Sequence, residues 1–583
     1  MKIHKIAIVT FFAGISGVFA QKKDEDLGSE VVNIVQPYTP SVSDAYKIKE
    51  TPVIEEDKQQ EKKPIEYNIF SFPVASTFSP AKGKAAAVDK EAREKLFNNY
   101  ATLGIGNYGT INAELFVTQP LEDNQYVGGL LRHLSSQGGI DGVVLDDNYS
   151  VTGIDLTYGV RDKEFTWNAD LGYQRQVNNW YGIFYPGDAL GEGVIDYPAG
   201  QIPNIQDPKQ TYSTAYVGGR ITTRDGFFHD MEIKYKRFWD GYDSAENRFF
   251  ITPSVDIPIS DMKIKFDFIA DYVGGEFGRD AINEYSHFNL GVQPSFLYQD
   301  GDLSAQFGAG LFYNMGKMSG VSDNNFYIYP QIKVSYKIVG DLLGAYAGAE
   351  GGLKQNSYAD FVDDNPFVMP ALYILPTDNK YDIYVGLKGK IANPVSFNLR
   401  AGYKNEGDHA FFGTSWLENY TLPDFSGVDP YLFGNSFYLV YGDLKTFSFS
   451  GDLKADFSKT VRFGINATYN SYTTNFDKAW NLPQITAGAN IDVDITEKWF
   501  AGANLFFVGE RDNFVTTLDG TPPYSVKLDS YFDLNANVGY KYNERLTGFL
   551  KLNNITGQNY EKWYNFPVQG FQFMLGASYK FNF

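Results

Sequence analysis

His133 and Ser135 are the two residues whose types and spacing could perform nucleophilic chemistry. They lie two positions apart in the stretch 133–138, so on a strand both side chains would point to the same side. An imidazole that takes up the hydroxyl proton would turn the serine into a nucleophile. The alternative is an ordinary polar strand end, and we favour it. The sequence therefore predicts no catalytic residue and no enzyme, and lipid hydrolysis through this pair is kept only as a remote alternative.

Metal and cofactor chemistry finds little support. The chain has five histidines and no cysteine, and neither an HxH nor an HExxH motif occurs. The glycines of 104–109 match G-x-G-x-x-G but precede no helix, so they are strand and turn glycines. Asp360, Asp363 and Asp364 offer the oxygen ligands that Ca²⁺ prefers, although a solvated acidic loop is the simpler interpretation. We predict no metal and no cofactor.

Composition limits the class of protein that holds these residues. The chain has 583 residues and a formal net charge of −20, without the basic stripe that binds nucleic acid. Aromatic residues make up 16% of it, which argues against a disordered chain, yet mean hydropathy is only −0.30. After residue 20 no apolar run approaches the roughly 20 residues of a membrane-spanning helix. An aromatic, all-β chain remains.

The first hundred residues differ from the rest. Residues 1–20 combine Lys2 and Lys5 with an apolar stretch and end in Val18 and Ala20, which predicts a secretory signal peptide. Residues 21–98 carry charge runs and repeated prolines, which predicts an extended or disordered periplasmic tail. One short helix is expected at about 89–95.

Beyond residue 99 apolar and polar residues alternate with period two. The clearest segments are 262–272, 461–469, 532–542 and 571–583. Such alternation indicates strands with one apolar face. The segments run about 10 to 15 residues, longer than the 5 to 6 that are typical of globular strands. We therefore predict an all-β fold, a transmembrane antiparallel β-barrel over 99–583.

Short and long connections alternate along this region. Ten short connections, such as 162–163 and 300–301, separate eleven outer ones, such as the tight turn 107–109 and the loops 177–209, 356–379, 408–442 and 557–569. These connections predict about 22 strands, with both chain ends in the periplasm and the long loops outside.

Residues 531–540, 550–556, 559–560 and 571–583 resemble the last three strands of TonB-dependent receptors. The stretches 104–109 and 132–138 are similar to a plugless, receptor-like barrel family of Bacteroidota. The resemblance implies uptake across the outer membrane of a Gram-negative bacterium. Receptors of the first family carry a globular plug before the barrel, whereas residues 21–98 lack a core, so we expect the plug to be absent.

Three groups of residues are candidate functional sites. Aromatic residues of the outer loops are expected to be exposed contact surfaces for a ligand or partner. The alternative is that they form the upper aromatic girdle or pack over the barrel mouth. Polar residues of the strands are expected to line the lumen, and the last aromatics to form the signal read by the barrel-assembly machinery. The first group is Trp180, Tyr181, Phe184, Tyr185, Phe411, Phe412, Trp416, Tyr560 and Trp563; the second is Lys263, Lys265, Asp267, Asn535 and Asn537; the third is Tyr579, Phe581 and Phe583.

Two main functions remain open. The first is transport or uptake of a small solute or an oligomeric nutrient. The second is a structural or interaction subunit of a larger outer-membrane assembly, whose tail and loops would reach periplasmic and surface partners. Outer-membrane lipid and the assembly machinery are expected partners in either case, and nucleic acid is not.

Overall fold

The computed structural model describes residues 26–27, 96–122, 124–183, 207–224, 226–259, 262–278, 280–392, 394–414, 429–516 and 523–583. Within these ranges, the side chains of 26–27, 259, 262–263 and 280–283 are not described. The predicted signal peptide at 1–20 and nearly all of the predicted tail at 21–98, including the expected helix at 89–95, lie outside the described residues.

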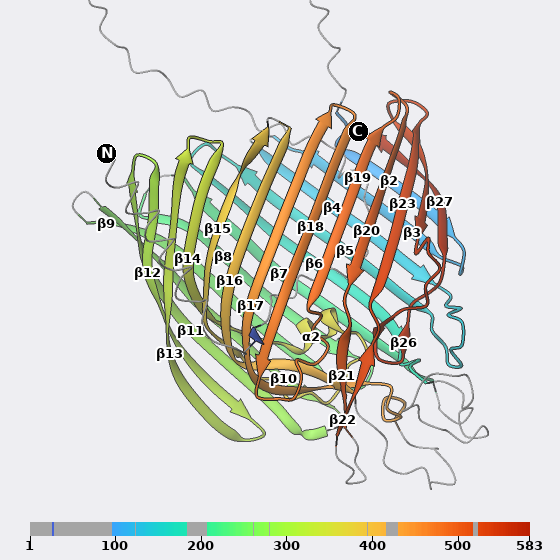
Figure 1. Ribbon diagram of the computed structural model, residues 1–583, viewed down its shortest axis with the longest axis horizontal. Helices are drawn as coiled ribbons and strands as arrows, with labels where there is room; N and C mark the ends of the chain where they lie inside the picture. Colours follow the sequence, from blue (N-terminus) through green and yellow to red (C-terminus); the bar gives the residue numbers. More distant parts are fainter. Residues whose placement is uncertain are drawn as a thin grey trace, which may run out of the picture. The chain divides into compact units, whose positions relative to one another are not determined.

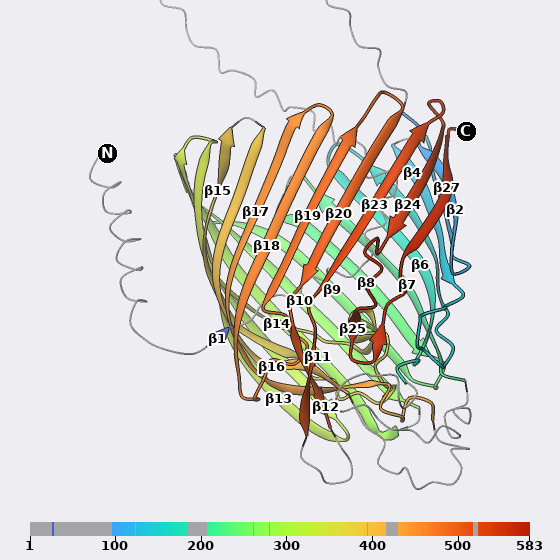
Figure 2. The same cartoon turned by 45° about the vertical axis from the view of Figure 1, so that its right-hand side comes forward.

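Twenty-two antiparallel strands close into a barrel (Figures 1 and 2). They are β2 (Asn99–Gly106), β3 (Ile111–Pro120), β4 (Gln125–Ser136), β5 (Tyr149–Arg161), β6 (Phe165–Asn179), β7 (Lys209–Thr223), β8 (Phe228–Asp240), β9 (Ala245–Ile259), β10 (Met262–Phe277), β11 (Asp280–Asp300), β12 (Leu303–Met318), β13 (Val321–Val339), β14 (Leu343–Lys354), β15 (Thr377–Ala392), β16 (Val395–Thr414), β17 (Phe437–Ser458), β18 (Val461–Thr474), β19 (Ile485–Asp494), β20 (Trp499–Val508), β23 (Tyr531–Lys541), β24 (Leu546–Asn553) and β27 (Gln572–Phe581). The first strand, β2, pairs with the last, β27, from Asn99↔Phe581 to Gly106↔Met574, which closes the ring. The predicted fold and its strand count are confirmed.

Among the described residues, five short strands and one helix lie outside the ring. β1 (Asp26–Leu27) pairs with β18, while β21 (Arg511–Val515) pairs with β22 (Tyr524–Leu528) and β25 (Glu561–Trp563) with β26 (Phe566–Pro567). The helix α2 (Tyr358–Asp364) stands between β14 and β15. Among the described residues, no helix has the length and apolarity that crossing a membrane requires.

The two faces of the barrel follow the alternation of the sequence. Large apolar side chains such as Leu103, Leu171, Phe449 and Leu575 are exposed on the outer face. Charged side chains alternate with them on the inner face, where they pair between strands, as in Arg400–Asp382 at 2.7 Å. An outer apolar band and a polar interior are the arrangement that a lipid bilayer requires of a barrel.

The turns have the conformations that their residues favour. Tyr108 and Gly109 between β2 and β3 both have positive φ, 58° and 59°, as a two-residue hairpin turn requires. The opposite end of the barrel carries the short connections, and it also carries the end of β27 (Figure 2). Because short turns face the periplasm and long loops face outside, the end with the long loops is the extracellular mouth.

Gly576 at the closing seam offers a test of barrel assembly. A Cβ at this inward-facing position would lie 2.5 Å from the carbonyl oxygen of Leu103 on β2 and would also clash with the ring of Phe549. Gly576→Val should therefore separate β27 from its neighbours and cost about 3 kcal/mol or more, since the backbone cannot yield. We expect a smaller fraction of folded barrel, measured by heat-modifiable migration on gels. Ala577→Val, on the outer face of the same strand, should fold normally.

Candidate functional site at the mouth of the barrel

Residues 355–376, here called the mouth segment, connect β14 to β15 and fold into the barrel. Figure 1 shows α2 among the strands near the end with the long loops. Most apolar side chains of the segment are buried, and Val362, Val368, Leu372 and Ile374 are almost completely so. They pack with inward-facing side chains of the wall and of other loops in one cluster. The segment therefore fills part of the mouth rather than standing above it.

A residue of the barrel wall helps to cap the N-terminus of α2. Ser357 is the N-cap, and its hydroxyl accepts a hydrogen bond from the Asp360 amide at 3.1 Å. Glu246 of β9, 1% exposed, accepts from the amides of Tyr358 at 2.6 Å and Ala359 at 3.3 Å. A carboxylate at a helix N-terminus accepts hydrogen bonds from the free amides and interacts favourably with the positive end of the helix dipole. Glu246 thereby fixes where the helix begins.

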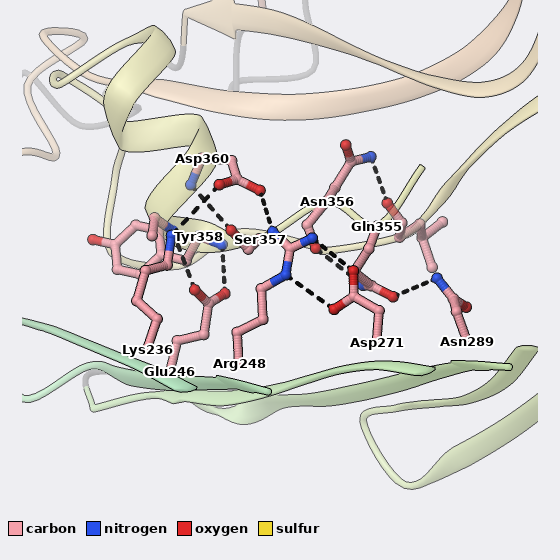
Figure 3. Close-up of polar contacts among 12 residues, drawn as sticks. Lys236, Glu246, Arg248, Asp271, Asn289, Gln355, Asn356, Ser357, Tyr358 and Asp360 are labelled. Atoms are coloured by element: carbon pink, nitrogen blue, oxygen red, sulfur yellow. Dashed lines mark hydrogen bonds and ion pairs between the residues drawn. The ribbon is translucent and has the colours of Figure 1, made fainter. Parts of the chain in front are cut away.

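Arg248 links the mouth segment to the wall by charge (Figure 3). Its guanidinium holds Asp271 of β10 through two bonds of 3.0 and 2.7 Å, and it reaches Asp360 of α2 at 3.0 Å. Lys236 of β8 adds a second cation, 3.6 Å from Asp360. The fork of arginine suits such a bridge because its donors are fixed in one plane.

Tyr358 makes the third wall contact of α2. Its hydroxyl donates to Asp240 of β8 at 2.9 Å, and its ring packs against Phe238 and Phe277. Burial raises the pKa of Tyr358 well above its ordinary value, so the hydroxyl keeps its proton and remains a donor.

Amide side chains fasten the two ends of the segment. Gln355 accepts from Asn289 of β11 at 2.7 Å, and Asn289 in turn accepts from Asn314 of β12 at 2.6 Å. Asn356 donates to the Leu375 carbonyl at 2.8 Å, which joins the first residues of the segment to the last (Figure 3 shows Asn289, Gln355 and Asn356).

Aromatic side chains from other loops meet the middle of the segment. Phe367 stacks on Phe566 with ring centroids 3.8 Å apart, and Tyr181 packs edge-on against both rings. Trp180 donates from its indole nitrogen to the Phe367 carbonyl at 3.1 Å. Trp563 packs against Phe412 and Phe437. Three loops and the ends of β16 and β17 thus interlock at the mouth.

These contacts change the interpretation of the predicted loop aromatics. Trp180, Tyr181 and Phe411 are buried, so their expected exposure was wrong and the alternative of packing at the mouth describes them; Phe412, Tyr560 and Trp563 are half-buried. The physical reason is that their rings pack against one another and against the barrel wall instead of being exposed to water. Binding of a ligand or partner by these residues stays a prediction. Tyr560 stacks on Tyr531 at 3.9 Å. Phe184, Tyr185 and Trp416 lie outside the described residues.

The predicted lumen residues that can be placed lie on the inner face. Lys265 and Asp267 alternate with the exposed Phe268 on β10 and form an ion pair at 2.8 Å. Asn535 and Asn537 alternate with the exposed Phe532 on β23. The side chain of Lys263 lies outside the described residues. Contact of these groups with a passing solute stays a prediction.

His133 and Ser135 do come together, but on the outer face. His133 lies 3.1 Å from the Ser135 hydroxyl through Nε2 and 2.8 Å from the Thr152 hydroxyl through Nδ1. They share a face with the exposed Leu131, which is directed to lipid. A hydroxyl cannot stabilise an imidazolium as a carboxylate does. We therefore carry no catalytic assignment forward.

The last aromatics belong to the lipid-facing stripe of β27. Tyr579 and the terminal Phe583 are exposed, and Phe581 lies between them in ring contact with both. Their reading by an assembly machinery stays a prediction. Asp360, one of the three acidic residues considered for Ca²⁺, is engaged by Arg248 and Lys236, and no cluster of metal-ligating residues exists among the described residues.

The wall residues that hold the mouth segment were not identified from the sequence. Glu246, Arg248 and Asp271 appear there only as polar positions of alternating strands. Inward charges near the outer ends of strands are a usable signal, but Asp360, the partner of Arg248 on the mouth segment, is 112 residues away in the chain.

No protein-family model matches the chain, and no curated protein matches it. Solved structures do resemble its fold. The FrpB iron transporter from Neisseria meningitidis (F3-3 variant) has a TM-score of 0.63 at 11% identity, covering 84% of this chain and 82% of that one. The ferripyoverdine receptor of the outer membrane of Pseudomonas aeruginosa has 0.59 at 12%, covering 84% and 72%. The ferric-catecholate import receptor Fiu from K12 E. coli has 0.59 at 10%, covering 84% and 82%.

At such identities the likeness is one of fold. These neighbours are TonB-dependent outer-membrane receptors with 22-stranded barrels. The predicted outer-membrane location and receptor-like barrel are confirmed.

Proposed function

We propose that this outer-membrane barrel imports a polar solute or an oligomeric nutrient and that the mouth segment is its gate. The observation that carries the proposal is the charged attachment of α2 to the inner wall through Arg248 and Glu246. A segment held inside a barrel by polar contacts can be released when a ligand or partner competes for those contacts. A purely apolar plug would offer no such exchange.

The inner face of the barrel is suited to the passage of a polar solute. It carries paired charges on neighbouring strands, such as Arg132–Asp155 at 3.1 Å and Lys333–Glu350 at 2.7 Å. Such a surface replaces the hydration of a polar solute without binding it tightly. The neighbours described as an iron transporter and as an import receptor support uptake as the class of function.

We further propose that the mouth segment closes the barrel in place of a plug domain. This proposal, and membership of the plugless Bacteroidota barrels, rest on the sequence of residues 21–98 and on the resemblance of 104–109 and 132–138.

A reversible lock tests the gate. Val368 and Phe437 are bridge partners that join the mouth segment to β17, and the chain has no cysteine of its own. In Val368→Cys/Phe437→Cys, the oxidised disulfide should reduce growth to that of a deletion strain in a medium where deletion slows growth. Reduction should restore it. The wall pair Val385→Cys/Ala401→Cys, across β15 and β16, is the matched control and should have no effect in either state.

A structural subunit is the second candidate, because interlocked loops at the mouth also suit a barrel that transports no solute. Affinity purification from solubilised outer membrane separates the two. Stable recovery of partner proteins, together with normal growth of the oxidised lock, would favour the subunit over the transporter.

A further inference from the structure

An open groove lies on the outer face of the barrel, near the extracellular end of β6–β9. It has a volume of about 680 Å³ and is lined by Leu171, Val217, Tyr235, Arg237, Trp239 and Asp243, among others. Leu171, Val217 and Tyr235 are exposed on the outer face, which places the groove against lipid rather than in the lumen.

Arg237 stands at the upper part of this groove on the lipid side. It alternates with the inward Phe238 and shares its face with the exposed Tyr235. It donates a hydrogen bond to the uncharged Asn247 of β9 at 2.9 Å. No carboxylate pairs with Arg237 among the described residues.

Arg175 of β6 faces the same way. Its register partner on β7 is Ser213, which in turn is paired with Trp239 of the groove on β8. The other arginines of the described barrel strands alternate with outward residues and point inward: Arg132, Arg161, Arg220, Arg248, Arg400 and Arg462. The two outward arginines of these strands therefore lie two strands apart, beside one groove.

The aromatic residues fix the height of the pair. Tyr173 and Trp239 lie in ring contact at 6.1 Å, and Tyr235 lies one outward position deeper than Arg237 on β8. Tyrosine and tryptophan gather where a bilayer meets water. Arginine at that level meets the head groups of the outer leaflet, and its planar fork suits phosphate.

We propose that this groove binds a phosphate-bearing lipid of the outer leaflet. The acyl chains lie along Leu171 and Val217, and Arg175 and Arg237 hold the phosphate. His133 and Thr152 lie in the same outward row as Arg175 and extend the polar border of the site. Asp240 and Asp243 both line its upper end. Asp240 is buried and accepts a hydrogen bond from Tyr358, whereas Asp243, in the loop beyond β8, is exposed and opposes an anion. The inference is independent of the transport proposal.

Binding of diphosphoryl lipid A to the purified barrel in neutral detergent tests the site, with native mass spectrometry as the readout. The wild type should retain the lipid, and Arg175→Gln/Arg237→Gln should bind it about tenfold more weakly or worse, as expected for lost charge-assisted contacts. Asp243→Asn should bind at least as well as the wild type.

Lys445→Gln is the matched control, since Lys445 faces outward on β17, away from the groove, and should bind like the wild type. The dephosphorylated lipid should bind more weakly, and inorganic phosphate should not compete at equal concentration. Any one of four results would overturn the proposal. The double variant could bind as well as the wild type, or Lys445→Gln could lose as much binding as the double variant. The dephosphorylated lipid could bind equally well, or inorganic phosphate could displace the lipid. The single variants Arg175→Gln and Arg237→Gln replace the double variant if it folds poorly, and each should then show a loss that Lys445→Gln does not.

Discussion

A barrel in which residues 356–375 are replaced by a short Asn-Gly turn should conduct ions where the wild type stays closed. Lys354 and Thr377 are direct register partners on β14 and β15, so a tight turn can join these strands without disturbing the wall. The deletion removes α2 and the buried side chains of the mouth segment together. Planar-bilayer recordings of the purified proteins measure the effect, and we expect long-lived open channels in the variant.

The matched control shortens another connection of the same rim. Residues 475–482 lie between β18 and β19, and Trp480 within them belongs to a separate buried cluster with Phe411 and Leu444. Their replacement by a similar turn should leave the barrel closed. If the deletion of 356–375 also leaves the conductance of a folded barrel unchanged, the mouth segment is not the barrier.

Arg248→Met should loosen the mouth segment while leaving the barrel folded. The substitution leaves the largely enclosed Asp271 without its cation and Asp360 with Lys236 alone, and breaking such a buried pair costs about 3 kcal/mol. The amides of Phe361 and Asn365, which are hydrogen-bonded within and at the end of α2, should exchange with solvent about a hundredfold faster. Hydrogen exchange followed by mass spectrometry measures the change.

Lys333→Met provides the comparison for this effect. It also breaks an inward ion pair, with Glu350, but on the strands β13 and β14 rather than on the mouth segment. Exchange in α2 should then match that of the wild type. Unchanged exchange in Arg248→Met would show that apolar packing alone holds the segment.

Much of the barrel could be predicted because each strand carries its own pattern. The alternation of 571–583 predicts an outward stripe, and Phe573, Leu575 and Tyr579 are exposed on one face. The first tight turn at 107–109 was predicted from Asn-Tyr-Gly and has the two positive φ angles of a hairpin turn. These are local effects, since they depend on neighbours in the chain and on two solvents, lipid and water.

The mouth could be predicted only in part. Its aromatic residues were recognised, but their burial was not predicted. A ring in a loop is buried or exposed according to which other residues contact it. Tyr181 is covered by Phe367 and Phe566, which lie far from it in the chain. The cation Arg248 and its partner Asp360 were equally hidden, since each looks in the sequence like a separate polar residue.

The sequence by itself determined a 22-stranded outer-membrane barrel, its lipid face and its long-loop end. Period-two alternation and turn residues are enough for this, because a bilayer leaves a chain few other ways to satisfy its backbone. The tertiary structure alone decided that residues 355–376 fold inward, that Glu246 and Arg248 hold them, and that Arg175 and Arg237 meet beside one groove. Those contacts join residues far apart in the chain, so they exist only once the ring of strands has closed.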